Sequence, residues 1–388
     1  MSVTTASPHD ELGPPRKLQR PPWLDWLVVA LLVYLLLVGV GAISDGFKAV
    51  AGNNARELFA FATNPLIALM VGMVATALTQ SSSTVTSIVV GLVAGGLPLS
   101  IAVPMVMGAN IGTSLTSTLV SLGHVRNGVE FRRAFAAGTV HDSFNILAVL
   151  LLLPLELMFQ PLERMAASSA SLLWGGASVS MSDVNFMKTL LAPALSGLAR
   201  ATSWLPGVWS GTALIVIGTA LILFVVTALG RVLRNLMVGR AREILHAAIG
   251  RGPLTGMVSG GLVTVAVQSS STTTALIVPL AGSGVVTLTQ VYPFVLGANV
   301  GTTVTALLAA TAISGPTAVV ALQLALIYFN LLGITLIFGL PALRNIPPFA
   351  AEGLATLAQR NKLYVASYVL GVFFVLPLLA LGTSQLFH

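Results

Sequence analysis

Long runs of apolar residues, rather than alternating apolar and polar positions, dominate this chain. Seven of these runs are long enough for a helix to cross a membrane, which takes about 20 predominantly apolar residues. A membrane β-barrel would instead show short segments in which every second residue is apolar. The pattern therefore predicts an all-α polytopic membrane protein. The predicted spans cover residues 23–43, 101–122, 134–158, 209–230, 290–311, 316–340 and 363–386.

Two further apolar segments, 64–97 and 254–287, are each interrupted near the middle by a polar motif. The interruptions begin at Gln80 and Gln268 and leave halves of about 14–17 residues, which are too short to cross the hydrocarbon core. We therefore predict two re-entrant helical hairpins, each of which enters and leaves the membrane on the same side.

The distribution of charge agrees with this topology. Only 8% of the residues are charged, against about a quarter in soluble proteins. Fourteen of the nineteen Lys and Arg residues fall on the same side as the N-terminus, so the positive-inside rule places the N-terminus in the cytoplasm and residues 159–208 outside. These flanking residues also account for the net charge of +7, so no nucleic-acid partner is implied. The predicted location is the cell membrane, inner or plasma.

The same order of span, hairpin, span and span occurs twice with opposite orientation, over 23–158 and 209–340. Such an inverted repeat is typical of transporters that work by alternating access. Residues 1–22 are rich in proline and predict a disordered cytosolic tail, and 341–388 predict an inner loop and a final span. Proline, glycine and serine predict that the linker 159–208 is an irregular loop with room for a short helix.

Each hairpin is broken by the same motif, and a second shared motif follows it. Duplicated polar motifs at membrane depth favour a solute site between two repeats. Helix packing through Ser, Thr and Gly is the alternative explanation. The motifs are Gln80-Ser81-Ser82-Ser83 with Gly108-Ala109-Asn110-Ile111-Gly112-Thr113, and Gln268-Ser269-Ser270-Ser271 with Gly297-Ala298-Asn299-Val300-Gly301-Thr302.

The hairpins offer only neutral groups to a solute. No Asp, Glu, Lys, Arg or His occurs in residues 64–108 or 253–297. A Ser at the break can cap the helix that follows, and the remaining N–H groups and the helix dipole then attract an anion. Two such helix starts that face each other would surround a multivalent oxyanion.

The second motif favours Na⁺ as a further ligand. Asn110, Thr113, Asn299 and Thr302 offer neutral amide and hydroxyl oxygens beside helix-weakening glycines. A transition metal would prefer His, Cys or carboxylate ligands, and proton coupling usually uses a titratable relay in the membrane, which the hairpins lack. Na⁺ is therefore the expected coupling ion, and no other cofactor is implied.

Four polar residues in the remaining spans leave two interpretations open. His141 and Asp142 form either a gating or ion-pathway pair, or an interfacial pair near the inner surface. Asn145 and Asn330 follow Phe residues at equivalent positions of the two repeats. They either line the pathway or hydrogen-bond between helices, and we favour the second.

These residues resemble the type II sodium–phosphate cotransporter family. Gln80–Thr86 reads QSSSTVT, Gln268–Thr274 reads QSSSTTT, and Glu130–Asn145 (EFRRAFAAGTVHDSFN) is also similar to animal members. The resemblance covers about residues 60–160 and 250–335. Animal members carry a disulfide-linked, glycosylated outer loop, whereas this chain has no Cys, so it resembles a bacterial member.

The resemblance implies Na⁺-driven uptake of inorganic phosphate by alternating access. Inorganic phosphate, Na⁺ and the lipid bilayer are the implied partners, and no protein partner is implied. Phosphate would bind at Gln80, Ser81, Ser82, Ser83, Gln268, Ser269, Ser270 and Ser271, and Na⁺ at Thr84, Asn110, Thr113, Thr272, Asn299 and Thr302.

Three other functions fit parts of the pattern. Na⁺-coupled transport of another oxyanion, such as sulfate or arsenate, would use the same neutral groups. A passive anion channel would show flux without Na⁺. An intramembrane serine hydrolase would need a base within reach of its nucleophile. Neither hairpin contains His, Lys or a carboxylate, so an enzyme is disfavoured.

Overall fold

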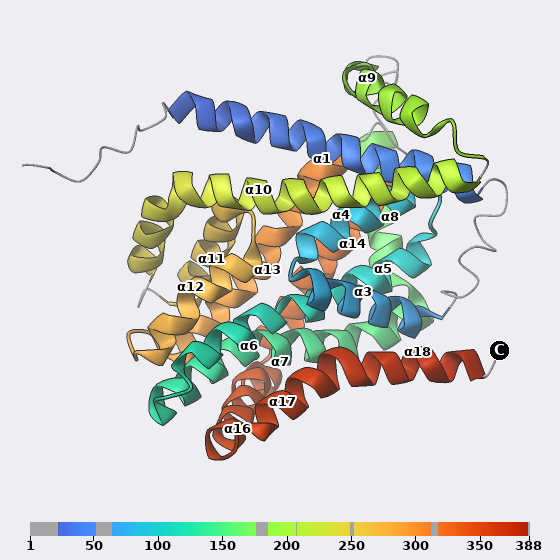
Figure 1. Ribbon diagram of the computed structural model, residues 1–388. Helices are drawn as coiled ribbons and strands as arrows, with labels where there is room; N and C mark the ends of the chain where they lie inside the picture. Colours follow the sequence, from blue (N-terminus) through green and yellow to red (C-terminus); the bar gives the residue numbers. More distant parts are fainter. Residues whose placement is uncertain are drawn as a thin grey trace, which may run out of the picture.

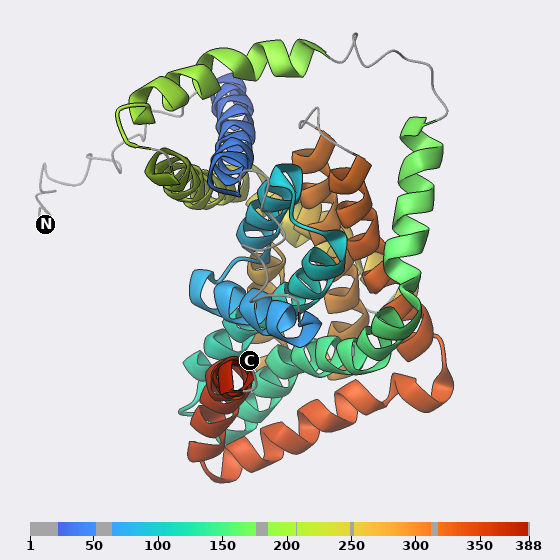
Figure 2. The same cartoon turned by 90° about the vertical axis from the view of Figure 1, so that its right-hand side faces the viewer.

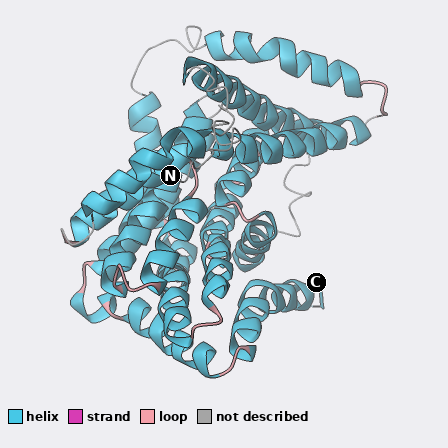
Figure 3. Ribbon diagram, turned by 60° about the vertical axis from the view of Figure 1, so that its left-hand side comes forward, coloured by secondary structure: helices cyan, strands magenta, loops and turns pink. Residues whose placement is uncertain are grey.

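The part of the chain that the structure describes is built from helices. This computed structural model describes residues 22–51, 64–175, 185–206, 208–248, 252–311 and 317–386. Helices joined by short connections form these segments, and no strand occurs among them (Figure 3). The predicted all-α class is therefore confirmed. Of the predicted tail 1–22, only Pro22 lies within the described residues, where it begins the first helix.

Six described stretches are long and apolar enough to cross a membrane, and each overlaps one predicted span. They are Trp23–Val50, Leu99–His124, Gly128–Phe159, Val208–Val225, Val320–Phe338 and Leu363–Ala380. The seventh predicted span, 290–311, is a single helix, α13 (Leu288–Thr311), which lies outside that set of six.

The helices that contain these stretches are longer than predicted at several ends. They are α1 (Pro22–Ala51), α5 (Leu99–Thr113) with α6 (Leu115–Ser121), α7 (Gly128–Phe159), α10 (Val208–Ala248), α14 (Thr317–Gly333) with a π-helical turn (Ile334–Phe338), and α17 (Leu363–Leu370), which a second π-helical turn joins to α18 (Leu376–Leu386).

The predicted hairpins are two pairs of short helices. α3 (Pro65–Thr79) and α4 (Ser82–Gly95) meet at Gln80, and α11 (Pro253–Val267) and α12 (Ser270–Gly282) meet at Gln268. Each helix has 13 to 15 residues. At 1.5 Å per residue this is about 20–23 Å, less than the roughly 30 Å hydrocarbon core. In Figure 1 the α3–α4 pair lies toward one end of the long helices α1 and α10, and the α11–α12 pair lies toward the other.

The linker between the two halves is more regular than predicted. Residues 159–208 contain two helices, α8 (Pro161–Gly175) and α9 (Asn185–Thr202). The prediction of an irregular loop was wrong for α8 because Pro161 is its first residue, where the missing N–H is not needed. In α9, by contrast, Pro193 lies inside the helix. The buried carboxylate of Glu156 also stabilises the start of α8, since it accepts hydrogen bonds from the N–H groups of Leu162 (2.7 Å) and Glu163 (3.0 Å).

The first helices of the two predicted repeats, α1 and α10, lie side by side and run in opposite directions (Figure 1). Gly39 lies against Gly218, and Gly46 lies against Gly211, so the contact is reciprocal. Small residues allow helices in a membrane to approach closely. Two repeats of opposite orientation would pack in this way.

A similar contact fixes the first arm of each hairpin to the helix that carries the Asn motif. α3 packs on α5, and α11 packs on α13. Gly108 faces the main-chain carbonyl of Leu69, Gly297 faces that of Met257, and a methyl group at either glycine would overlap that carbonyl. These glycines therefore hold the Asn motifs directly beside the hairpins.

One helix lies across the others at an end of the molecule. α16 (Ile346–Arg360) is seen nearly end-on in Figure 1, where α1, α10 and α18 run across the picture, and it is seen from the side in Figure 2. It follows the short helix α15 (Pro341–Arg344), so the predicted inner loop is largely helical. A helix perpendicular to the spans suits the membrane–water interface.

Candidate solute site at the two hairpin breaks

Both hairpins are broken by a glutamine in the left-handed helical conformation. Gln80 has φ 55° and ψ 26°, and Gln268 has φ 54° and ψ 30°. This conformation costs a residue other than glycine about 1–3 kcal/mol, so it persists only where the surroundings hold it. Each side-chain amide donates a hydrogen bond to a carbonyl near the end of the preceding helix, that of Ala77 or Val265. The glutamines thereby close the first arms.

The next residue caps the second arm of each hairpin, as the sequence predicts. Ser81 and Ser269 have extended backbones, and their side-chain oxygens accept hydrogen bonds from the N–H groups of Thr84 (3.2 Å) and Thr272 (3.1 Å). Such a cap satisfies only one of the free N–H groups at a helix start. Both breaks therefore have the same local structure in the two repeats.

The remaining N–H groups at the two helix starts are available to a ligand. The N–H groups of Ser82 and Ser83 in α4, and of Ser270 and Ser271 in α12, form no hydrogen bond with another described residue. All four serines are buried, whereas Gln80, Ser81, Gln268 and Ser269 are half-buried. Buried N–H groups at a helix start attract an anion, because the dipole adds to their partial charge.

Three consecutive residues in α6 connect the two breaks. Thr116 donates a hydrogen bond to the side-chain oxygen of Gln80 (2.7 Å), and Ser117 donates one to the hydroxyl of Thr274 in α12 (2.6 Å). Thr118 donates a longer one, 3.3 Å, to the carboxylate of Asp142. The structure thus brings both hairpins and an acidic residue to the first turns of one short helix.

The Asn motifs form a crossed pair of hydrogen bonds between the repeats. Asn110 donates to the side-chain oxygen of Asn330 (3.0 Å), and Asn299 donates to that of Asn145 (2.8 Å). Asn145 also donates to the main-chain carbonyl of Asn110 (2.9 Å). All four side chains are buried. The favoured interpretation of Asn145 and Asn330, hydrogen bonding between helices, is confirmed.

The threonines among the predicted Na⁺ ligands are more dispersed. Thr84 donates a hydrogen bond to Ser81 (2.9 Å) within the first break. Thr113 and Thr302 each donate to a carbonyl of their own helix, at 2.9 and 3.1 Å, and neither bonds to another predicted ligand. Thr272 is half-buried at the start of α12. The predicted Na⁺ ligands therefore do not form a single hydrogen-bonded group.

His141 and Asp142 are buried inside the bundle, with no exposed surface. His141 forms a hydrogen bond through Nε2 with the side-chain oxygen of Asn299, which joins it to the Asn network. Asp142 Oδ2 accepts hydrogen bonds from Tyr368 of α17 (2.7 Å) and from Thr118, and Oδ1 has no partner among the described residues. The two side chains do not bond to each other, and their complete burial favours the interpretation as gating or ion-pathway residues.

Sequence reasoning missed two parts of this polar interior. The run Thr116-Ser117-Thr118 follows the first Asn motif directly, and three adjacent polar residues inside a predicted span were the available signal. Gln323 of α14 is fully buried, and neither atom of its amide has a partner among the described residues. Buried polar groups without partners cost free energy, so this amide is a further candidate to contact a ligand or water.

The donor set suits an alkali cation and an oxyanion better than a transition metal. Within the described part of the chain, no group of three or more His, Cys, Asp or Glu side chains could hold a metal ion. The oxygens present belong to hydroxyl, amide and carbonyl groups, with one carboxylate at Asp142. Hard oxygen ligands of this kind suit Na⁺.

These features define a helical membrane protein with a duplicated polar site between its two halves. The chain belongs to the Na⁺/Pi-cotransporter family, whose model matches residues 35–175 and 221–382. The predicted resemblance is therefore confirmed.

Individual relatives carry the names of phosphate transporters. The chain is 33% identical to sodium-dependent phosphate transport protein 2A of Rattus norvegicus and 30% identical to protein 2B of Homo sapiens, in both cases over 91% of its length. It spans 66% and 64% of these relatives, respectively. No solved structure matches the chain.

Proposed function

We propose that this protein couples the Na⁺ gradient to the uptake of inorganic phosphate. The observation that carries the proposal is the pair of capped helix starts at Ser81 and Ser269, both linked to α6 through Thr116 and Ser117. Family membership and the names of the relatives support phosphate and Na⁺ as the solutes. The function is transport rather than catalysis, since the hairpins contain no base that could activate a serine.

Phosphate binds, in this proposal, at the two helix starts. The free N–H groups of the serines donate to its oxygens, and the rotatable hydroxyls of Ser81 and Ser269 add donors, because a capping oxygen still carries its own hydrogen. The half-exposed Gln80 and Gln268 border the same site. A tetrahedral oxyanion suits such a set, because its oxygens can accept from several directions at once.

Na⁺ binds to the neutral oxygens beside these breaks and in the Asn motifs. The predicted ligands are Thr84, Asn110, Thr113, Thr272, Asn299 and Thr302. Asp142 is a further candidate from the structure. Its buried carboxylate accepts hydrogen bonds from two hydroxyl groups, and no basic side chain among the described residues bonds to it. Buried charges in a membrane are generally paired or bind ions. Asp142 is therefore an additional candidate ligand for a coupling cation.

Transport proceeds by alternating access of two inverted repeats, 23–158 and 209–340, with re-entrant hairpins. The opposite placement of the hairpins, the reciprocal α1–α10 contact and the crossed Asn pairs support this proposal. The N-terminus and α16 then lie on the cytoplasmic side, and the linker helices α8 and α9 lie outside. Repeats in this arrangement expose a central site to one side and then to the other by rocking.

Phosphate uptake into proteoliposomes tests the function. The purified protein would be given radiolabelled phosphate with an inward Na⁺ gradient or an equal K⁺ gradient, with and without excess sulfate. We expect uptake only with Na⁺ and no inhibition by sulfate. Equal uptake in both gradients would indicate a passive channel, and strong inhibition by sulfate would indicate a broader oxyanion transporter.

A further inference from the structure

A cavity of about 550 Å³ lies at the far end of the second hairpin, away from the Ser motif. Three elements enclose it: the first turns of α7, the loop between α12 and α13, and the transverse helix α16. Arg132 and Arg133 contribute from α7, Gly284 and Thr287 from the loop, and Glu352 and Thr356 from α16. The cavity is therefore built by elements from both repeats and by the helix that follows them.

Positive charge in this cavity is poorly compensated. Arg132 and Arg133 are exposed, and neither guanidinium forms an ion pair, hydrogen bond or ring contact with another described residue. Glu352 is the only acidic side chain in the lining. Two guanidinium groups next to one carboxylate leave a net positive cavity.

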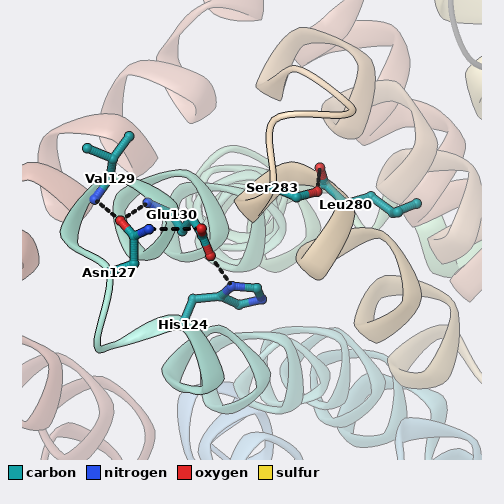
Figure 4. Close-up of polar contacts among 6 residues, drawn as sticks. All are labelled: His124, Asn127, Val129, Glu130, Leu280 and Ser283. Atoms are coloured by element: carbon teal, nitrogen blue, oxygen red, sulfur yellow. Dashed lines mark hydrogen bonds and ion pairs between the residues drawn. The ribbon is translucent and has the colours of Figure 1, made fainter.

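The acidic residue closest to these arginines in the sequence is already occupied. Glu130 accepts a hydrogen bond from Asn127 (2.8 Å) and pairs with His124 (3.3 Å) at the start of α7. Figure 4 shows this group beside Leu280 and Ser283 at the end of α12. Glu130 therefore bonds to Asn127 and His124 rather than to the arginines. The two guanidinium groups remain available to an external anion.

We propose that this cavity binds a phosphate-bearing anion through Arg132 and Arg133. The planar guanidinium group matches phosphate oxygens in a two-pronged hydrogen bond, which makes arginine the preferred side chain for this ligand. Two sources offer the same chemistry at this place: inorganic phosphate that has left the hairpin site, and the headgroup of an anionic phospholipid next to the transverse helix α16.

An anion in this cavity would lie beside the second hairpin, which moves in the proposed transport cycle. A methyl group added at Gly284 would come within 2.7 Å of an Arg133 nitrogen, so the arginine rests on the hairpin loop. The ring of His124 lies against Gly282, the last residue of α12. An anion held here would contact the second hairpin at its far end. A role for this site in the release of transported phosphate, or in control of hairpin movement by a lipid, rests on the proposed function. Binding of the anion itself does not.

Phosphate binding in the absence of Na⁺ tests the inference, because the proposed transport is coupled to Na⁺ whereas the lining of this cavity includes none of the proposed Na⁺ ligands. The full-length protein would be placed in nanodiscs of phosphatidylcholine in choline chloride buffer, and the binding of radiolabelled inorganic phosphate would be measured by equilibrium dialysis. We expect saturable binding that weakens about tenfold or more in the double variant Arg132→Gln/Arg133→Gln, a difference of about 1.4 kcal/mol.

Two further variants separate loss of the site from loss of folding or of surface charge. Arg126→Gln removes an exposed charge just before α7 and outside the cavity lining, and it should bind phosphate normally. Arg132→Lys/Arg133→Lys keeps both charges and should retain part of the binding. Absence of Na⁺-independent binding in the parent protein, or equal binding in parent and Gln double variant, would overturn the inference.

Nanodiscs that also contain phosphatidylglycerol identify the source of the anion. If a lipid headgroup occupies the cavity, added phosphatidylglycerol should compete with phosphate at a salt concentration that screens the surface charge. If free phosphate is the ligand, binding should be unchanged. Na⁺-driven uptake by the same preparations is read separately, so failure of transport with intact Na⁺-independent binding would count against the proposed function alone.

Discussion

Asn110 donates a 3.0 Å hydrogen bond to Asn330, a residue 220 positions later in the chain. The matching residue of the second motif, Asn299, donates a 2.8 Å bond to Asn145 in the first repeat. The side-chain amide of each Asn motif therefore binds the other half of the molecule, while the main-chain carbonyl of Asn110 also accepts from Asn145 in its own half. If the halves rock against each other, these bonds either form the pivot or break and re-form during each cycle.

A double-mutant cycle on Asn110→Ala and Asn330→Ala measures this link. Each single variant should lower stability by about 1–3 kcal/mol, because it leaves a buried amide without its partner. The double variant should cost less than the sum, with a coupling energy of about 0.6 kcal/mol, as found for hydrogen bonds between membrane helices. Unfolding in mixed detergent micelles gives the three values, and strict additivity would show that the bond contributes nothing.

A substitution at Ser81 separates capping from phosphate binding. Asp is as good a helix cap as Ser, so Ser81→Asp should keep the hairpin folded. The added negative charge should repel phosphate and reduce uptake at least about tenfold, or about 1.4 kcal/mol. Asn64→Asp is the control, since the side-chain oxygen of Asn64 also caps a helix start, that of α3, at an exposed position (2.9 Å to the Leu66 N–H). Normal uptake by Ser81→Asp would remove Ser81 from the phosphate site.

The sequence predicted the breaks of the hairpins but not the contacts that join them. Gln80, Ser81 and their counterparts could be placed because a polar run inside an apolar segment is evident from the sequence alone. Helix capping could also be predicted, because it depends on residues that are neighbours in the sequence. Thr116 and Thr274 could not be assigned partners, because their contacts lie across the fold. The surroundings of Asp142 were likewise hidden, since Tyr368 of α17 and Thr118 of α6 both bond to this residue of α7.

In the linker, residues 159–208, the sequence misled the prediction of secondary structure itself. Its prolines and serines suggested a loop, although α8 and α9 are regular helices. The signal was misleading because the composition of a segment does not reveal whether a proline falls at a helix start or whether a distant carboxylate, here Glu156, caps that start.

Gly297→Ala should disrupt the contact between α11 and α13. A methyl group there would overlap the carbonyl of Met257, and backbone must move to relieve the overlap. We expect a loss of stability of about 1–3 kcal/mol, as for other overpacked positions, together with loss of uptake. The control is Gly197→Ala in α9, where no atom lies within 4 Å of the added carbon. That variant should be neutral or more stable by up to about 1 kcal/mol.

Thermal unfolding in detergent compares these two glycine variants directly. An unchanged midpoint for Gly297→Ala, with normal uptake, would mean that the close approach of the two helices is not needed.

Thr116→Val tests whether the contact between α6 and the first hairpin break supports phosphate binding. The change keeps the shape of the side chain and removes only the hydroxyl that binds Gln80 (2.7 Å). A neutral hydrogen bond contributes about 0.5–1.5 kcal/mol, so phosphate affinity should fall about two- to tenfold. Thr335→Val is the control, because this exposed threonine bonds only to its own helix, at Leu331. Equal transport kinetics in both variants would show that the contact has no role in binding.

Asp142→Asn should specifically weaken the dependence of uptake on Na⁺. The variant keeps the size of the side chain and an oxygen that can accept from Tyr368 and Thr118, but it removes the negative charge. If Asp142 is a cation ligand, the Na⁺ concentration for half-maximal uptake should rise about tenfold or more, equal to about 1.4 kcal/mol. Tyr368→Phe, which keeps the charge and removes one hydrogen bond of 2.7 Å, should have a smaller effect on the same measurement. A loss of folded protein in Asp142→Asn, with normal Na⁺ dependence in the fraction that folds, would assign the carboxylate to the packing of α17 instead.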